Sequence, residues 1–162
     1  MKLYRVTNKK WADTFNGLGA SYEDGARWNS AGYPVIYFAL DLATAMIEAA
    51  NYHPSPDLIP PSHCKAIYEV DDDILIEKLD PSLLPDDWDK MPYPKSTQVI
   101  GDAFLSSKSA AILLVPSVGV GVSSEYLIAV VNPNHPDINK IRLIDTQQPV
   151  YSKRMFAGLF IG

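Results

Sequence analysis

Proline is the residue that most constrains how this chain can fold. Four prolines lie within the eleven residues of HPSPDLIPPSH, at positions 53–63, and four more lie within DPSLLPDDWDKMPYPKS, at positions 80–96. Proline has no backbone N–H and its ring clashes inside a helix, so neither segment can form a long helix or a central strand. The chain is therefore predicted to consist of short elements joined by irregular connections.

Hydrophobic runs around the two proline-rich segments have the lengths of strands and short helices. We expect about six or seven strands against two or three helices, which is typical of an α+β fold with a mostly antiparallel or mixed sheet. A long loop is expected over 21–34. The predicted strands cover 2–6, 35–40, 110–117, 125–131 and part of 139–156, with a strand, an acidic turn and a strand over 64–79; a helical turn is expected within 8–20, and helices over 41–52 and 97–108.

Length and composition set limits on the class of protein. The 162 residues have the size of one domain, 1–162, and no hydrophobic run approaches the roughly 20 residues of a membrane span. The first residues lack the hydrophobic stretch of a secretory signal, and the single cysteine, Cys64, cannot form an internal disulfide. We therefore expect a cytoplasmic protein that does not bind membranes.

The net charge of −5 does not favour direct binding to a nucleic acid. A few arginines and backbone amides can still bind a small anion. The histidines and the cysteine do not have the sequence spacing of structural zinc ligands, and we expect no metal site. The glycines of GVGVSS match neither a P-loop nor a dinucleotide-binding fingerprint.

The segment that follows the 35–40 strand should form a helix capped by Asp41. The helical period places Leu42 and Met46, with Ala49 or Ala50, on its inward face. Glu48 lies at the margin of that face, where a carboxylate is exposed, paired or functional.

Three further residues stand out by their setting. Arg27 lies in the glycine-flanked loop GARWN, where its planar guanidinium could hold a phosphate or form a structural salt bridge. Tyr37 lies in a hydrophobic strand and is either a core residue or a flat surface for a ring. Ser117 ends a predicted strand before two glycines, where it could bind a ligand or simply terminate the strand.

Four stretches of the sequence occur in the order of a known family. They are LYRV, GARWNSAGYPVIYFALDLATAMIEA, VPS and NPNHP, which extend from residue 3 to about residue 136. The chain resembles the RES domain family, toxins of RES-Xre toxin–antitoxin systems. The resemblance implies an ADP-ribosyltransferase-like fold around an NAD cleft, and a toxin that depletes NAD as its substrate without a further cofactor.

The resemblance also implies the site residues and the partner. Arg27, Tyr37 and Glu48 match the principal site, and Ser117 matches the signature serine of the family. The family's further substrate-binding positions correspond to Arg5 in LYRV and to Asn132 in NPNHP. Glu125 corresponds to an acidic position of the link between the serine and NPNHP. A cognate Xre-like antitoxin is implied, and contact with DNA would belong to it.

A mechanism follows as a hypothesis. Arg27, with Arg5, would hold the pyrophosphate, and Tyr37 would stack on nicotinamide. Glu48 would stabilise the positive charge that develops on the ribose, and Ser117 would support binding. Water, inorganic phosphate or a protein side chain could attack, so hydrolysis, phosphorolysis and modification of a protein target stay open. A protein-interaction domain without catalysis is the alternative from another class.

Overall fold

The computed structural model describes residues 1–121 and 125–160. Its centre is a seven-stranded sheet with the order β4-β5-β6-β2-β1-β3-β7. Neighbouring strands are antiparallel, except that β4 runs parallel to β5. The predicted α+β class with a mixed sheet is therefore confirmed. The strands are β1 (Lys2–Asn8), β2 (Ile36–Ala39), β3 (His63–Val70), β4 (Ile76–Lys78), β5 (Ile112–Pro116), β6 (Leu127–Val131) and β7 (Ile141–Gln147).

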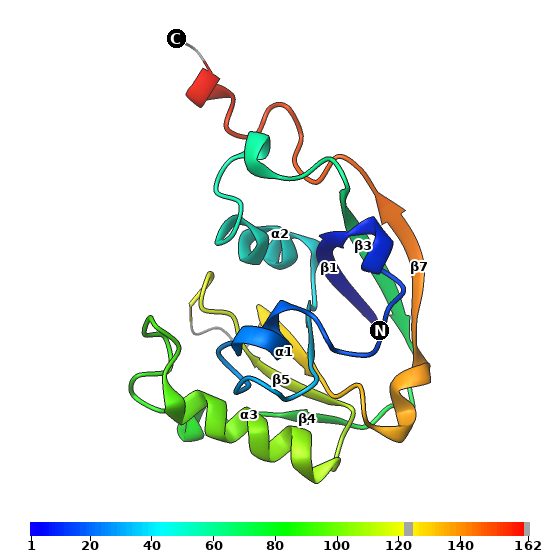
Figure 1. The fold of residues 1–162 in the computed structure, drawn as a ribbon, viewed down its shortest axis with the longest axis vertical. Coiled ribbons are helices and arrows are strands. Elements are labelled where there is room, and N and C mark those ends of the chain that lie inside the picture. The colour runs from blue at the N-terminus through cyan, green and yellow to red at the C-terminus, as the bar shows by residue number, and fades with distance from the viewer. Residues whose placement is uncertain (122–124, 161–162) are drawn as a thin grey trace.

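Three α-helices lie within the described residues: α1 (Ala20–Asp24), α2 (Leu42–Ala50) and α3 (Lys95–Ser107). In Figure 1, α2 lies beside β1 in the upper half of the molecule, whereas α3 runs along β4 and β5 at the bottom. Short 3-10 helices occupy parts of the connections, including both proline-rich segments. The regular elements are thus short, as the prolines predicted.

Helix α1 lies where only a loop was expected. It spans five residues and ends at Gly25, whose φ of 77° favours glycine and whose amide donates to the carbonyl of Ser21. A helix of this length shows no hydrophobic period, so the sequence carries little signal for it. The helical turn predicted within 8–20 is a 3-10 helix over Lys9–Trp11.

Asp41 caps α2 as predicted. Its carboxylate accepts the backbone amide of Thr44 at 2.8 Å and the hydroxyl of Thr44 at 2.6 Å. The predicted inward face is wrong, because the buried residues of α2 are Thr44 and Ala45. Met46 instead lines a pocket with Tyr151 of the C-terminal segment, and the Tyr151 hydroxyl donates to the Met46 carbonyl at 2.8 Å.

The two faces of the sheet carry separate hydrophobic clusters, because neighbouring residues of a strand point to opposite sides. We call the side of Leu3, Phe38 and Tyr68 the Phe38 face. The opposite side, which carries Tyr37 and Val130, is the Tyr37 face. Trp28, Trp88 and Phe104, from connections and α3, pack on the Tyr37 face.

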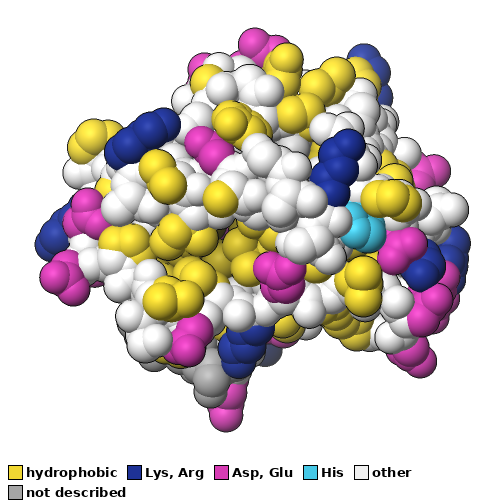
Figure 2. All heavy atoms as spheres, turned by 90° about the horizontal axis from the view of Figure 1, so that it is seen from below, with side chains coloured by type: hydrophobic (Ala, Val, Ile, Leu, Met, Phe, Trp, Pro, Cys, Tyr) yellow, Lys and Arg dark blue, Asp and Glu magenta, His cyan; other side chains and the backbone are white. Residues whose placement is uncertain are grey.

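The underside of the molecule, where α3 and β4 lie, exposes hydrophobic side chains. Figure 2 shows them gathered across the middle of this face, with acidic side chains among and around them. Leu83 and Val99 are 65% and 56% exposed and belong to the connection after β4 and to α3. None of the helices in the described part of the chain has the length and hydrophobicity needed to cross a membrane.

Candidate functional site

The loop that carries Arg27 is fixed on α3. At Gly101 the helix touches the loop directly, because a Cβ atom there would lie 1.6 Å from the carbonyl oxygen of Trp28. The Nε2 atom of Gln98 donates to the carbonyls of Ala26 and Asn29, at 3.1 and 3.2 Å. These contacts hold the backbone on both sides of Arg27.

A second set of bonds fixes the same loop at Ser30. Its backbone amide and its hydroxyl both donate to the carboxylate of Asp102 in α3, at 2.8 and 2.6 Å. Lys95 donates to the Ser30 hydroxyl oxygen at 2.7 Å. The loop is therefore a rigid platform, and the direction of the Arg27 side chain is set by α3.

The Arg27 guanidinium contacts the second proline-rich segment. Its Nη1 atom donates to the carbonyls of Trp88 and of Lys90, the latter at 3.0 Å, and Nη2 lies 3.5 Å from the sulfur of Met91. The guanidinium carbon lies 5.3 Å from the centre of the Tyr93 ring. Across residues 1–121 and 125–160, no carboxylate forms a salt bridge with Arg27.

This arrangement leaves part of the Arg27 fork for a ligand. A guanidinium has five N–H donors, and two backbone carbonyls occupy those of Nη1. The edge formed by Nε and Nη2 carries only the weak contact to Met91. Such an edge matches two oxygens of a phosphate or a carboxylate.

The Tyr37 hydroxyl is already committed within the protein. It donates to Oδ1 of Asn29 at 2.7 Å and accepts the Trp28 amide at 3.2 Å. Burial is the main cause that raises the pKa of Tyr37, with smaller contributions from Tyr52 and Tyr93, so the hydroxyl stays neutral. The hydroxyl is thus occupied within the protein, and the ring is half-buried against the hydrophobic cluster of this face.

Glu48 is paired with Ser117. The buried Ser117 hydroxyl donates to Oε1 of Glu48 at 2.5 Å, and the Ser117 amide donates to the carbonyl of Tyr126 at 3.3 Å. Gly119 approaches the same carboxylate closely, since a Cβ atom there would lie 3.5 Å from Oε1 of Glu48 and 2.9 Å from Ile47. The end of β5 thus orients the Glu48 carboxylate.

Two tyrosines that the sequence analysis missed connect Arg27 with Glu48. The hydroxyls of Tyr52 and Tyr93 lie 3.1 Å apart, and we call this pair the tyrosine bridge. Burial of its hydroxyl end is the first cause that raises the Tyr52 pKa, followed by Tyr93 and Glu48, whereas Arg27 lowers it. Tyr52 therefore lies within electrostatic reach of both the cation and the anion.

The sequence carried a signal for one tyrosine only. Tyr52 follows Glu48 by four residues, the spacing that places two side chains on one face of a helical turn. Tyr93 lies in the second proline-rich segment, where no periodic pattern of hydrophobic residues indicates which side chains face inward. Asn29, which orients Tyr37, carried no signal beyond its place in the loop motif.

Arg5 lies apart from this group. Tyr4 pairs with Ala39, so Tyr4 lies on the same face of the sheet as Ala39 and Tyr37. The next residue, Arg5, therefore lies on the opposite, Phe38 face. Its guanidinium carbon is 6.0 Å from the centre of the Phe38 ring, and burial lowers the pKa of Arg5. It makes no hydrogen bond or ion pair with any residue in the described part of the chain.

Asn132 also lies apart. Its side-chain amide donates to the Leu105 carbonyl of α3 at 2.9 Å and its Oδ1 accepts the Asn134 amide at 3.0 Å, so the side chain joins the turn after β6 to α3. The Asn132 amide donates to the carbonyl of Ala111, the residue before β5, whereas Ser117 follows the last residue of β5. At about 3.4 Å per residue, the length of that strand separates them.

Two other predicted features have different outcomes. Glu125 is exposed and precedes Tyr126, whose carbonyl binds the Ser117 amide, so Glu125 lies at the same end of the sheet as Ser117. Of the glycine-rich loop expected over 118–124, residues 122–124 lie outside the described residues. The structure thus brings together Arg27, Tyr37, Glu48 and Ser117, and adds Tyr52 and Tyr93; we call these six residues the site group.

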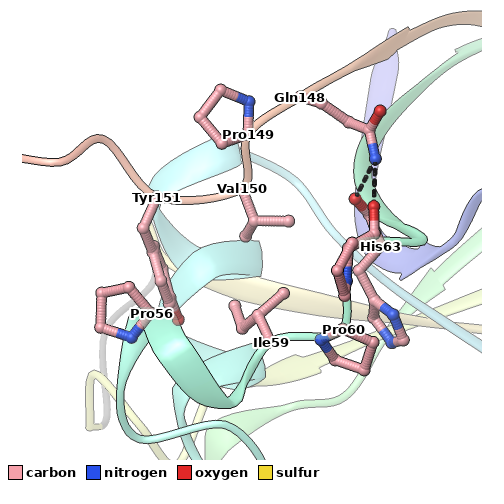
Figure 3. Close-up of a pocket in the computed structure, with 9 residues that line it drawn as sticks. Pro56, Ile59, Pro60, His63, Gln148, Pro149, Val150 and Tyr151 are labelled. Carbon is pink, nitrogen blue, oxygen red and sulfur yellow. Dashed lines mark hydrogen bonds between the residues drawn. The ribbon is translucent and has the colours of Figure 1, made fainter.

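A pocket of about 420 Å³ lies elsewhere, between the first proline-rich segment and the end of β7. Figure 3 shows Pro56, Ile59 and Val150 around it, with Gln148 bonded to the backbone beside His63. No residue of the site group lines it. Among residues 1–121 and 125–160, no cluster of three or more histidine, cysteine, aspartate or glutamate side chains could hold a metal.

Comparison with protein families agrees with the motifs around this site. The model of the RES domain matches residues 2–152, which is most of the chain. The chain belongs to the RES domain family. The match includes every residue of the site group.

Curated relatives and a solved structure extend this result. A protein of Sphingobium sp. strain YBL2 named Prs ADP-ribosylating toxin is 34% identical over 146 residues, 89% of this chain and 88% of that protein. Toxin Res of Yersinia enterocolitica is 33% identical over 136 residues, 83% of this chain and 86% of that toxin. A chain in the crystal structure of the M. tuberculosis MbcT–MbcA toxin–antitoxin complex has the same fold, with a TM-score of 0.73. The two chains are 21% identical, and the match covers 98% of this RES domain chain and 87% of that chain.

Proposed function

We propose that this RES domain protein is a toxin that consumes NAD by breaking the bond between nicotinamide and ribose, and that a cognate Xre-like antitoxin restrains it. The observation that supports the proposal is the tyrosine bridge, because the Arg27 guanidinium lies 5.3 Å from the Tyr93 ring and both Arg27 and Glu48 act on the Tyr52 hydroxyl. NAD has an anionic pyrophosphate and a cationic nicotinamide. A site with separate positive and negative ends suits such a substrate.

The positive end would bind the pyrophosphate. Arg27 is held through Nη1 by two backbone carbonyls and offers its Nε and Nη2 edge to two phosphate oxygens. Because α3 fixes the loop, little ordering is left for the moment of binding. Arg5 is left out of this role, since it lies on the Phe38 face.

The ring of Tyr37 would stack on nicotinamide. Its hydroxyl is bonded to Asn29 and Trp28, so the ring is fixed in one orientation. The electron-rich face of an aromatic ring attracts a cationic heterocycle. This contact weakens once nicotinamide leaves as a neutral molecule, which favours its release.

The negative end would act on the ribose. As the bond to nicotinamide breaks, its electron pair goes to the nicotinamide nitrogen and positive charge develops on the ribose. The Glu48 carboxylate would stabilise that charge, and Ser117 would hold its Oε1 in place. In hydrolysis, a water oxygen then bonds the ribose carbon and loses a proton, which gives ADP-ribose. Inorganic phosphate in place of water would give ADP-ribose 1''-phosphate.

Modification of a protein target is the second candidate function. The observation in its favour is the 34% identity to the relative named Prs ADP-ribosylating toxin. Arg27, Tyr37 and Glu48 would act on NAD in the same way, and a side chain of the target would replace water as the attacking group. The two functions differ in the fate of the ADP-ribose, which a labelled substrate reports.

The antitoxin is inferred from the family and from the structural relative. The solved structure with the same fold is of a toxin–antitoxin complex. With a net charge of −5, the chain is a poor partner for DNA, so contact with an operator would belong to the antitoxin. Both proteins would act in the cytoplasm, where NAD is available.

The experiment that tests the proposal is incubation of the purified protein with NAD, with and without phosphate, and identification of every product. We expect free nicotinamide together with ADP-ribose or its 1''-phosphate. Glu48→Gln, which keeps the shape of the side chain, should lower the rate by about 100-fold to 1000-fold. Label transferred to protein would favour the second candidate, and unchanged NAD without any NAD binding would favour an interaction domain without catalysis.

A further inference from the structure

Among the described residues, the tyrosine bridge is the one hydrogen bond within the site group that joins two exposed or half-exposed side chains. Tyr52 is 70% exposed, yet its hydroxyl lies 3.1 Å from that of Tyr93. Tyr52 follows α2, which carries Glu48, and the Tyr93 ring lies beneath the Arg27 guanidinium. The bridge therefore spans the two elements that supply the opposite charges of the site.

Tyr93 is held more firmly than Tyr52. The Tyr93 ring contacts the Arg27 guanidinium, whose Nη1 is bonded to the Trp88 and Lys90 carbonyls of the same segment. Beyond Tyr93, no described residue hydrogen-bonds the Tyr52 hydroxyl. If the bridge opens, Tyr52 is the side chain that changes position.

We propose that Tyr52 is a substrate-binding residue whose hydroxyl leaves Tyr93 and donates to a phosphate oxygen of the bound dinucleotide. This inference rests on the proposed function, since it takes NAD as the ligand. Arg27, which would hold the pyrophosphate, lies within electrostatic reach of the Tyr52 hydroxyl. The phosphate would then lie between the guanidinium and the phenol.

The exchange of partners is favourable on chemical grounds. In the free protein, the bridge is a hydrogen bond between two neutral phenols. A hydrogen bond to an anionic phosphate oxygen is roughly twice as strong as a neutral one. Burial first, and then Tyr93 and Glu48, raise the pKa of Tyr52, so the phenol keeps its proton and remains a donor.

The exchange makes opposite predictions for the two tyrosines. Tyr52→Phe removes the donor to phosphate and should weaken binding. Tyr93→Phe removes only the competing partner of Tyr52 and leaves the ring beneath Arg27, so it should leave binding unchanged or tighten it. A purely structural role of the bridge would affect both variants alike.

The test measures binding by calorimetry with ADP-ribose, which contains the pyrophosphate and has no nicotinamide bond to break. We expect Tyr52→Phe to raise the Kd by roughly five-fold to ten-fold. Tyr93→Phe should give the wild-type Kd or a lower one. Tyr22→Phe is the matched control, because no described residue hydrogen-bonds the Tyr22 hydroxyl. Adenosine, which lacks phosphate, should bind all four proteins equally.

Each outcome decides a separate point. An unchanged Kd in Tyr52→Phe overturns the inference, and so does an equal loss of affinity in both bridge variants. A wild-type protein that binds no ADP-ribose contradicts the proposed function itself. Steady-state NAD consumption adds a second readout: Tyr52→Phe should raise KM while kcat stays within about two-fold, because the contact acts in binding.

Discussion

The two faces of the sheet carry the same kinds of side chain in different surroundings. On the Phe38 face, Arg5 lies over the Phe38 ring, and the Tyr68 hydroxyl donates to the Ala12 carbonyl at 2.7 Å. On the Tyr37 face, Arg27 lies over the Tyr93 ring and Tyr37 is bonded to the loop that carries Arg27. The Tyr37 face also carries the Glu48 carboxylate, which accepts the Ser117 hydroxyl.

The comparison teaches that residue type alone does not make a site. An arginine over an aromatic ring occurs twice, but only Arg27 has the rigid backbone support of α3 and an anion across the tyrosine bridge. Arg5 is surrounded by the hydrophobic cluster, which lowers its pKa and offers no partner among the described residues. Under the proposed function, the face of the sheet decides which of the two arginines binds the substrate.

The largest expected effect separates the two arginines. Arg27→Met should lower NAD consumption by about 100-fold to 1000-fold, because it removes the charge at the pyrophosphate. Arg5→Met should leave the turnover within about three-fold and keep or raise the free energy of unfolding, since it removes a half-buried cation. Product analysis and urea unfolding measure both. A loss of turnover in a folded Arg5→Met protein would contradict the division between the faces.

The next effect tests how α3 supports the Tyr37 face. Gly101→Ala places a Cβ atom against the Trp28 carbonyl, so the loop or the helix must move. We expect a loss of about 3 kcal/mol or more in the free energy of unfolding, although alanine is normally the better helix residue by about 1 kcal/mol. Gly158→Ala, which meets no atom within 4 Å, is the control and should change little. A stabilised Gly101→Ala protein would show that the loop does not rest on α3.

A smaller effect compares the two tyrosines. Tyr37→Phe leaves Oδ1 of Asn29 and the Trp28 amide without partners, and should cost about 2–3 kcal/mol. Tyr68→Phe leaves only the Ala12 carbonyl and should cost about 1 kcal/mol. If the Tyr37 ring alone acts on the substrate, Tyr37→Phe keeps its turnover within a few-fold. A loss as large as that of Arg27→Met would assign the hydroxyl itself a catalytic role.

The smallest effect is a pH dependence of stability at His63. Burial, and then the neighbouring His53, lower the pKa of His63, and its Nδ1 atom is buried without a partner. Below about pH 6.5 the unfolded chain therefore binds more protons than the folded one, so stability should fall as the pH drops towards 5. In His63→Gln, the Tm from thermal unfolding should depend less on pH between 6.5 and 5. The turnover at pH 7.5 should stay unchanged. An identical pH slope in the variant would exclude His63 as the cause.

Local sequence rules predicted much of the fold. The β2 strand and the α2 helix follow from one hydrophobic run and a capping aspartate, so Asp41 marks the boundary correctly. The inward face of α2 could not be predicted, because Met46 lines a pocket with a distant C-terminal segment. Helix α1 was missed because five residues are too few to show a period.

The grouping of the candidate site residues was predictable where the motif and the topology agree. Arg27, Tyr37 and Glu48 lie on consecutive elements, and the structure brings them together with Ser117. The family motif includes Arg5 and Asn132 as well, but a motif does not report the face of a strand or the end of a sheet. Tyr93 was out of reach, because its place beneath Arg27 depends on a contact across more than sixty residues of chain.

The hydrogen bond between Ser117 and Glu48 has a consequence for biosynthesis. The two residues are 69 positions apart, and the carbonyls that hold Arg27 come from Trp88 and Lys90. A nascent chain that has emerged from the ribosome only as far as α2 contains Arg27 and Glu48, but not yet the groups that hydrogen-bond them. The complete site group therefore cannot assemble until β5 and Ser117 have been translated, which leaves it incomplete for most of the synthesis.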